Sequence, residues 1–289
     1  MPYVTTRDGT NLRWKELGQG RPVVLIHGWP LSADSWDPIM IKLAEAGYRA
    51  IAYDRRGFGY SDHAPRGYDY NTFADDLADV MQATGATDNV ALVGFSMGGG
   101  EIARYMSRHG GKGVSQAALV SSVVPYLLKT DDNPDGVPQA TFDQMTAGMK
   151  KDFRHFFTGF FSDFYGDGVL VDAVSKEEKD WAWMTAMCAS QYATLQSAKA
   201  FSTTDFRPDL AHLTVPTLVI HGTADKTVPI EPTARAVAKA VPSATLVEYD
   251  GEPHAVFATK TDRLAEDLIV FLQQGTGQAG QAGGETPVR

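Results

Sequence analysis

One serine lies among glycines directly after an apolar run. Residues 94–100 read GFSMGGG and follow NVALV. A strand that ends in so tight a turn can hold a serine in strained geometry, because Gly94 and Gly98 let the turn close against the following helix. The alternative is a glycine-rich turn in which Ser96 is a small filler. Because the pattern G-x-S-x-G is common by chance, Ser96 is a candidate nucleophile that needs support from the rest of the chain.

A serine nucleophile needs a base to take its proton and an acid to orient that base. Two later apolar stretches supply such residues: VPTLVIHGTAD ends in Asp225, and TLVEYDGEPH ends in His254. Asp250 lies on the same short loop as His254 and is a rival acid, but the turn residues before Asp225 favour Asp225. Ser96, Asp225 and His254 are therefore candidates for a catalytic triad of acyl transfer.

The chain has seven histidines, so six compete with His254 for the role of base. His109 should lie about 15 Å from Ser96, at the far end of the next helix. Three others do not follow an apolar run: His63, His155 and His212. His27 and His221 do follow one, but each lies in an Ile-His-Gly turn, where we expect a ring that is hydrogen-bonded to nearby backbone.

Acyl transfer also needs backbone N–H groups for the developing oxyanion. One donor is expected from Met97, the residue after the serine, and a second from the loop HGWP at 27–30. Trp29 is the natural second donor, because Pro30 has no N–H. Pro30 should also orient the Trp29 peptide groups, since proline restricts its own backbone and that of the preceding residue.

The elements that would position these residues alternate along the chain. YVTTRDGTNLRWKEL alternates around an Asp-Gly turn, which indicates a hairpin. The later apolar runs are PVVLI (22–26), YRAIAY (48–53), NVALV (89–93), QAALVS (116–121), TVPTLVI (214–220) and ATLVEY (244–249). Such runs are typical of strands covered on both faces, and helical periodicity lies between them. The sequence predicts an α/β fold with a mostly parallel central sheet and helices on both faces.

One segment, 125–206, breaks this alternation. It has no convincing strand but has helical patterns rich in aromatic residues and methionine. We expect a helical cap here, inserted between core segments 1–124 and 207–274, over the strand ends where open α/β sheets bind ligands. Residues 275–289 are rich in Gly, Gln and Ala and are expected to form a flexible tail. We expect most aromatic residues of this segment to pack on the sheet and only a few to line a pocket; the candidates are Phe142, Phe153, Phe156, Phe160, Trp181 and Trp183.

Five motifs together resemble a known family: HGWPLSADSW, YDRRGFGYSD, GFSMGGGE, HGTADKTVPI and GEPH. They are similar to those of the α/β-hydrolase branch that contains bacterial aryl esterases and cofactor-free haloperoxidases, or perhydrolases. The resemblance implies the α/β-hydrolase fold, with Ser96, Asp225 and His254 as triad and Trp29 and Met97 as oxyanion donors. It also implies hydrolysis of carboxylic esters without metal, haem or flavin, a side reaction in which hydrogen peroxide replaces water, and relatives that are often oligomeric.

Composition argues against several kinds of partner. The 289 residues carry a formal net charge of -9 and no block of Lys or Arg, so nucleic acids and membrane surfaces are not expected partners. The single cysteine, Cys188, cannot form an internal disulfide, and MPYVTTRDGT has no apolar signal-peptide core, so we expect a cytoplasmic protein. Because Cys188 lies in the apolar run WAWMTAMCAS, we expect a buried packing residue.

Several alternatives stay open. Arg55 and Arg56 in DRRGFG could anchor an anionic substrate, although paired structural roles are the stronger expectation. A triad alone does not choose the bond, so lactones, C–C bonds and amides rival small apolar or aryl esters as substrates. A ligand-binding module without catalysis is a further rival. The serine at position 96 disfavours haloalkane dehalogenase and epoxide hydrolase activities, which need an aspartate there.

Overall fold

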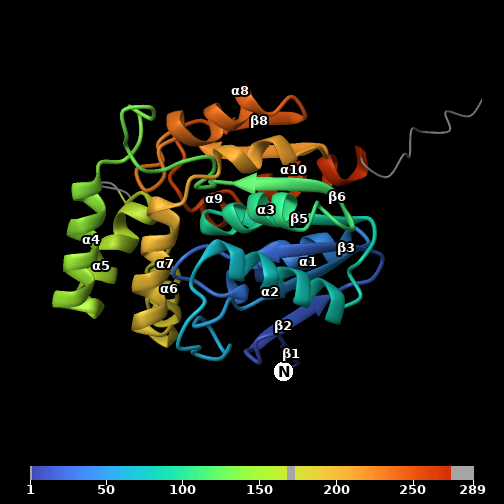
Figure 1. The fold of residues 1–289 in the computed structure, drawn as a ribbon, viewed down its shortest axis with the longest axis horizontal. Helices are drawn as coiled ribbons and strands as arrows, with labels where there is room; N and C mark the ends of the chain where they lie inside the picture. The colour runs from blue at the N-terminus through green and yellow to red at the C-terminus, as the bar shows by residue number, and fades with distance from the viewer. Residues whose placement is uncertain (1, 168–172, 275–289) are drawn as a thin grey trace, which may run out of the picture.

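A central sheet organises the molecule. The computed structural model describes residues 2–167 and 173–274, and in these ranges an 8-stranded sheet has the order β1-β2-β4-β3-β5-β6-β7-β8 (Figure 1). Hairpin strands β1 and β2 are antiparallel to each other, β2 is antiparallel to β4, and all other pairs are parallel. The strands are β1 (Tyr3–Thr5), β2 (Asn11–Leu17), β3 (Arg21–Ile26), β4 (Tyr48–Tyr53), β5 (Val90–Phe95), β6 (Val114–Val120), β7 (Thr217–Gly222) and β8 (Ala244–Tyr249). The predicted hairpin and the mostly parallel sheet are confirmed.

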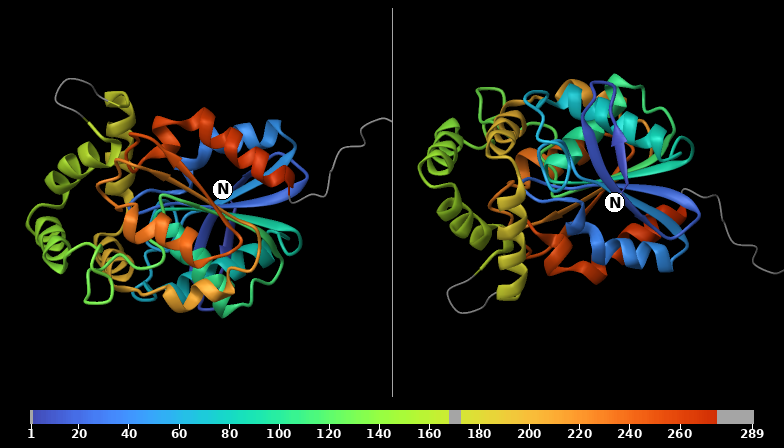
Figure 2. Two further views of the ribbon diagram at one scale, coloured as in Figure 1. Left: turned by 90° about the horizontal axis from the view of Figure 1, so that it is seen from above. Right: turned by 90° about the horizontal axis from the view of Figure 1, so that it is seen from below.

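Helices cover both faces of this sheet. α1 (Asp37–Glu45) and α10 (Thr261–Gln274) pack together on one face, while α2 (Tyr70–Ala83) and α3 (Met97–Arg108) pack together on the other (Figure 2). Because both faces are covered, every residue of β5 and β7 is buried, whereas the edge strand β8 is mostly half-exposed. Shorter elements are η1 (Ala33–Trp36), η2 (Arg207–His212), η3 (Glu231–Arg235), α8 (Ala236–Ala240) and α9 (Val256–Thr259).

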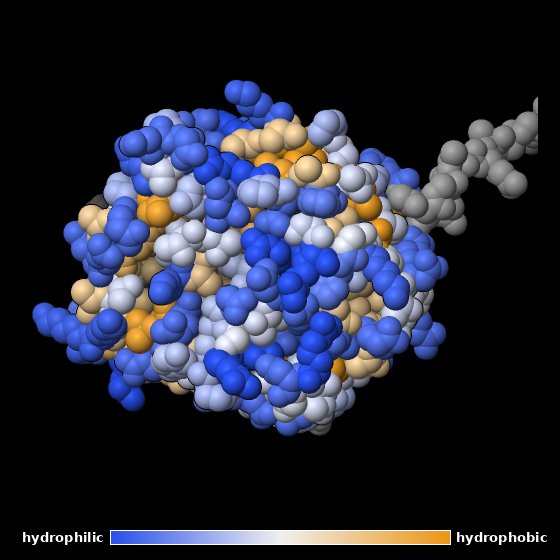
Figure 3. Space-filling view, viewed as in Figure 1, coloured by the Kyte–Doolittle hydropathy of each residue, from blue (hydrophilic) through white to orange (hydrophobic). Residues whose placement is uncertain are grey.

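A group of helices lies beyond the carboxyl ends of the parallel strands. It consists of α4 (Gln139–Lys151), α5 (Phe153–Tyr165), α6 (Lys176–Cys188) and α7 (Gln191–Thr203), at the left of Figure 1. Figure 3 shows hydrophobic side chains among hydrophilic ones at the same place. The division of the chain at 125 and 206 stays a prediction, and the predicted tail at 275–289 lies outside the described residues.

Cys188 does not have the predicted environment. It is the last residue of α6 and is exposed, so the prediction of a buried packing residue is wrong. The buried residues of α6 are Ala182 and Ala186, one turn apart, and position 188 lies about 200° around the helix from Ala186. Because the run WAWMTAMC is almost entirely apolar, its composition does not indicate that only the two small alanines face inward. Within the two described ranges, every helix is too short or too polar to cross a bilayer.

Candidate active site

Ser96 occupies a strained turn between β5 and α3. Its backbone has φ 52° and ψ -116°, a left-handed conformation that costs about 1–3 kcal/mol for a residue with a side chain. A Cβ on Gly94 would lie 2.6 Å from the Gly98 backbone, and one on Gly98 would lie 2.5 Å from the carbonyl oxygen of Ile26. Only glycine fits at these two positions, so the motif is a tight turn built around the serine.

The structure brings Ser96, Asp225 and His254 into one hydrogen-bonded chain. His254 Nε2 lies 2.9 Å from Ser96 Oγ, and His254 Nδ1 lies 2.6 Å from Asp225 Oδ2. All three side chains are buried. Because the carboxylate can only accept, Nδ1 carries a proton, and Nε2 of the neutral ring is then free to take the serine proton.

Asp225 is held as a carboxylate by its neighbours. Its Oδ1 accepts the backbone N–H groups of Thr227 at 2.9 Å and Val228 at 2.8 Å. Burial by itself would raise the pKa of Asp225, but the attraction of His254 and hydrogen bonds from His221 and His254 outweigh it and lower the pKa to about 2. The acid therefore stays ionised at neutral pH.

The rival acid and four of the six rival histidines lie away from Ser96. Asp250 is exposed and accepts a hydrogen bond from the Thr223 hydroxyl at 3.2 Å, so Asp225 is the acid that is bonded to His254. His109 Nε2 lies 2.8 Å from Asp75 at the end of α3. Three further histidines are exposed: His63, His155 and His212.

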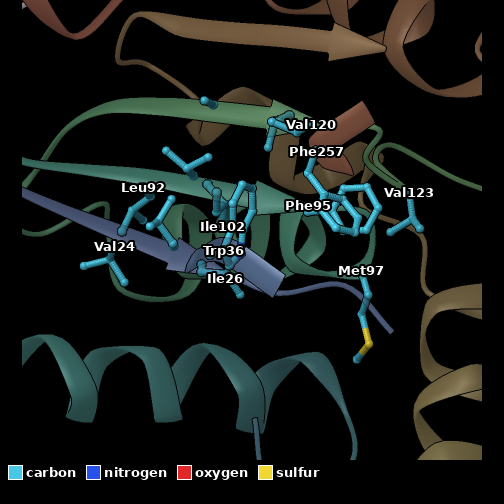
Figure 4. Packing of buried hydrophobic residues seen from close by; sticks show 14 of the residues in the cluster. Val24, Ile26, Trp36, Leu92, Phe95, Met97, Ile102, Val120, Val123 and Phe257 are labelled. Atoms are coloured by element: carbon cyan, nitrogen blue, oxygen red, sulfur yellow. The ribbon is translucent and has the colours of Figure 1, made fainter. Parts of the chain in front are cut away.

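An aromatic cluster packs around the ring of His254. Phe95 packs against Phe257 at the end of β5, with ring centroids 4.8 Å apart (Figure 4), and its centroid lies 5.0 Å from that of His254. Phe164 of α5 packs on the His254 ring at 5.1 Å. Contacts with both rings limit rotation of the imidazole, so the core and the helices beyond the strand ends both position His254.

Two backbone N–H groups near the serine have no acceptor. Met97 begins α3, and Trp29 lies on the loop after β3; among the described residues, neither of their N–H groups donates a hydrogen bond. The Trp29 side chain is fixed separately, because its Nε1 donates to the Thr194 carbonyl of α7 at 3.0 Å. The peptide bond between Trp29 and Pro30 is cis. Unpaired N–H groups here could bind a developing oxyanion, and Met97 adds the positive end of the α3 dipole.

His27 orients the peptide that carries the Trp29 N–H. Its Nε2 accepts the Arg55 backbone N–H at 3.0 Å, so Nδ1 carries the proton and donates to the Gly28 carbonyl at 2.8 Å. The Leu31 N–H donates to the same carbonyl at 3.0 Å. Because C=O and N–H of one peptide point in opposite directions, these two bonds direct the Trp29 N–H away from His27. The backbone bonding predicted for His27 is confirmed, but sequence reasoning missed this consequence.

The arginine pair has structural roles. Arg55 donates to the His27 carbonyl at 2.8 Å and pairs with buried Glu101. Arg56 pairs with Asp76 through bonds of 2.7 and 2.6 Å and with Asp8 at 2.8 Å. Both guanidinium groups are almost fully buried and paired, so the structural interpretation is confirmed and neither arginine is a free anion clamp.

A cavity of about 430 Å³ opens onto the serine. It is lined by Trp29, Ser96, Val123, Leu127, Val137, Thr141, Phe142, Met145, Phe156, Gly159, Phe160, Asp163, Phe201, Lys226, Thr227, Val228 and His254. Most of these are apolar; Asp163 and Lys226 are exposed and of opposite charge. The cavity is thus shaped for a small molecule that is largely apolar.

Three of the six predicted aromatic residues line this cavity, namely Phe142, Phe156 and Phe160. This agrees with the expectation that only a few of the candidates line the pocket; Phe153, Trp181 and Trp183 do not. Phe153 lies in the first turn of α5 and packs on Phe157 at 5.0 Å. Trp181 and Trp183 belong to α6, which packs against α5 and forms no wall of the cavity, so both line other surface hollows.

No group of three or more His, Cys, Asp or Glu side chains within residues 2–167 and 173–274 is arranged to hold a metal ion.

Comparisons with known proteins agree with this geometry. Residues 21–261 match the family described as the alpha/beta hydrolase fold. The chain is 42% identical to the non-heme chloroperoxidase CPO-A1 of Kitasatospora aureofaciens, over 95% of this chain and 100% of that protein. It is 37% identical to the bifunctional esterase/perhydrolase DCH of Acinetobacter calcoaceticus, over 94% of this chain and 100% of that protein.

Solved structures give the same result. The bromoperoxidase from Bacillus anthracis superimposes with a TM-score of 0.91 and 40% identity, covering 94% of this chain and 99% of that one. An esterase from Exiguobacterium antarcticum superimposes with a TM-score of 0.89 and 31% identity, covering 94% and 98%. The similarity extends through the helices beyond the strand ends and is not confined to the sheet.

Proposed function

The chain belongs to the α/β-hydrolase fold family, and on that basis we propose that it is a serine carboxylesterase that acts on small apolar or aryl esters and has a perhydrolase side activity. The observation that carries the proposal is the hydrogen-bonded chain from Ser96 through His254 to Asp225, at a strained turn that opens onto an apolar cavity. Relatives described as an esterase and as a bifunctional esterase/perhydrolase support the same chemistry.

The first half-reaction forms an acyl-enzyme. Ser96 Oγ attacks the ester carbonyl carbon while His254 Nε2 takes the hydroxyl proton, and the carbonyl electron pair becomes an oxyanion bound by the N–H groups of Trp29 and Met97. When the oxyanion collapses, the C–O bond to the alcohol breaks and His254 returns its proton to the departing oxygen. Asp225 stabilises the transient imidazolium throughout without taking a proton.

The second half-reaction releases the acyl group. Water gives a proton to His254 Nε2 while its oxygen attacks the acyl carbon. The bond between that carbon and Ser96 Oγ then breaks, His254 returns the proton to Oγ, and the carboxylic acid departs. Hydrogen peroxide can take the place of water in the same step, and the product is then a peracid. Pro30 enters the proposal here: it orients the Trp29 carbonyl, which can accept a hydrogen bond from peroxide as it attacks.

The cavity supports the proposed substrate class. Its walls of phenylalanine, valine and leucine favour apolar or aryl acyl and alcohol groups. Asp163 and Lys226 carry opposite charges, so together they give the cavity no net attraction for an anion.

Covalent labelling of the serine tests the proposal. A fluorophosphonate probe should attach one phosphonyl group to Ser96, seen as the mass of a single adduct. Ser96→Ala should form no adduct, and its turnover of phenyl acetate should fall by at least about 10³-fold, as in other triad deletions. Thr141→Ala, in the same cavity, is a matched control and should keep the adduct. Turnover by Ser96→Ala close to that of the parent enzyme would refute the assignment, and an unlabelled parent protein would indicate a binding module.

Two further expectations stay predictions. A cytoplasmic location rests on cysteine usage, and a homo-oligomer rests on the resemblance alone.

A further inference from the structure

A second histidine lies against the proposed catalytic acid. His221, the second-to-last residue of β7 before the loop that carries Asp225, is 0% exposed. Its Nε2 lies 2.8 Å from the Val228 carbonyl oxygen and 3.2 Å from Asp225 Oδ2. The expectation that this ring bonds to nearby backbone is confirmed, but its contact with Asp225 is additional.

The bonding partners of His221 determine its tautomer. The Val228 carbonyl can only accept, so Nε2 carries a proton. Nδ1 is buried and bonds to no group in the described residues. A second proton on Nδ1 would be a buried donor without an acceptor, which is costly. The Nε2–H is therefore donated to Val228, and the same nitrogen lies within 3.2 Å of Asp225 Oδ2.

The Asp225 carboxylate is consequently held on both oxygens. Oδ1 takes two backbone N–H groups, from Thr227 and Val228, while Oδ2 takes the N–H of His254 and has His221 Nε2 against it at 3.2 Å. Val228 gives its N–H to Asp225 and its C=O to His221, which closes the loop around the acid.

We propose that His221 is a positioning residue for the catalytic acid: its Nε2–H shares Asp225 Oδ2 with His254 and keeps that oxygen in line with His254 Nδ1. This role rests on the proposed function, in which Asp225 orients His254. Without the His221 donor, the carboxylate is free to rotate about its Cβ–Cγ bond within the limits of its two backbone bonds, and the imidazole loses alignment with the serine. A residue that merely braced the loop through Val228 would leave this alignment unchanged.

The test compares two substitutions of His221. His221→Phe keeps the ring shape and removes both nitrogens, whereas His221→Gln offers an amide N–H near the position of Nε2. For each variant we would measure kcat and KM for phenyl acetate, the melting temperature, and the downfield proton resonance of the hydrogen bond between His254 and Asp225. His109→Phe, at the far end of α3, controls for loss of a histidine elsewhere.

His221→Phe should lower kcat by about 10- to 100-fold, as loss of an orienting hydrogen-bond partner does at other sites, with KM within about twofold, and should shift the downfield resonance. His221→Gln should recover most of kcat and the resonance. Unchanged kcat and an unchanged resonance in His221→Phe would overturn the proposal. If His221→Phe does not fold, His221→Asn is compared with His221→Gln instead, because the shorter amide of asparagine cannot reach Asp225. Equal kcat in the two variants would overturn the proposed role of His221. A lower kcat for His221→Asn would support it.

Failure of this inference differs from failure of the proposed function. If Ser96→Ala is inactive and unlabelled while His221→Phe retains full kcat, the esterase assignment stands and the role of His221 is wrong. If Ser96→Ala retains turnover, both are wrong.

Discussion

Replacing Asp225 by asparagine should put the base into the wrong tautomer. Two backbone N–H groups, from Thr227 and Val228, point at Oδ1, so the amide oxygen of the new side chain must take that side. Its NH₂ group then faces His254 Nδ1, which lies 2.6 Å from Oδ2 in the parent protein. An NH₂ group can only donate, so Nδ1 loses its proton and Nε2 gains it. A protonated Nε2 cannot accept the proton of the serine.

The size of the effect follows from this geometry. An Asp-to-Asn change that reverses the tautomer in a Ser-His-Asp triad costs about 10⁴-fold in kcat, which is about 5.5 kcal/mol of transition-state stabilisation. Asp250→Asn is the matched control, because Asp250 is exposed and accepts from the Thr223 hydroxyl, whereas Asp225 is the acid bonded to His254. Its effect should stay within about 0.5 kcal/mol, or about twofold.

Both variants can be assayed with phenyl acetate under saturating substrate, with circular dichroism as a check on folding. KM should change little for Asp225→Asn, since the acid does not line the cavity. If Asp250→Asn lost more activity than Asp225→Asn, the acid would be misassigned. If the kcat of Asp225→Asn fell by less than about tenfold, the argument that the backbone bonds to Oδ1 fix the amide orientation, and with it the tautomer of His254, would be refuted.

Three other predictions concern peroxide, substrate and pH. Pro30→Leu should lower the ratio of perhydrolysis to hydrolysis, measured in acetate with peroxide, while ester hydrolysis stays the same or rises; a parallel fall of both activities would make Pro30 a loop brace only. Phenyl acetate should be turned over faster than a dicarboxylate monoester, because the cavity is mainly apolar, and the reverse preference would contradict the proposed substrate class. Burial alone would raise the pKa of Asp225, but His254 and His221 lower it from 3.8 to about 2. The contribution of the ionised carboxylate to the free energy of unfolding is therefore complete above about pH 4 and is lost as the pH falls through 2. The difference in unfolding free energy between the parent and Asp225→Asn, measured by urea titration, should therefore shrink below about pH 4, and a constant difference would contradict this linkage.

The main elements and the candidate triad could be predicted because their signals are local. The apolar runs become the parallel strands, since a strand covered on both faces needs apolar residues at every position. The glycines around Ser96 indicate a tight turn, because a Cβ at position 94 or 98 would collide with backbone. Asp225 and His254 each follow a strand whose neighbours are parallel, so their position at the same edge of the sheet follows from chain order.

Predictions that depended on which side of a helix faces inward were less successful. Cys188, Trp181 and Trp183 all lie in the C-terminal part of α6, where the run WAWMTAMC places apolar residues on every side of the helix. Packing of α5 against α6 decides which of these side chains is buried, and the sequence of α6 alone carries no signal for that choice.

By itself, the sequence determined the strands, the strained turn and the order of Ser96, Asp225 and His254. Only the tertiary structure decided how these groups are held. Ser96 and His254 are 158 residues apart and meet at 2.9 Å. Arg55 donates its N–H to His27 and so selects the tautomer that orients the Trp29 peptide. The direction of a hydrogen bond depends on groups from several strand ends at once, and their positions are set by the register and packing of the whole sheet.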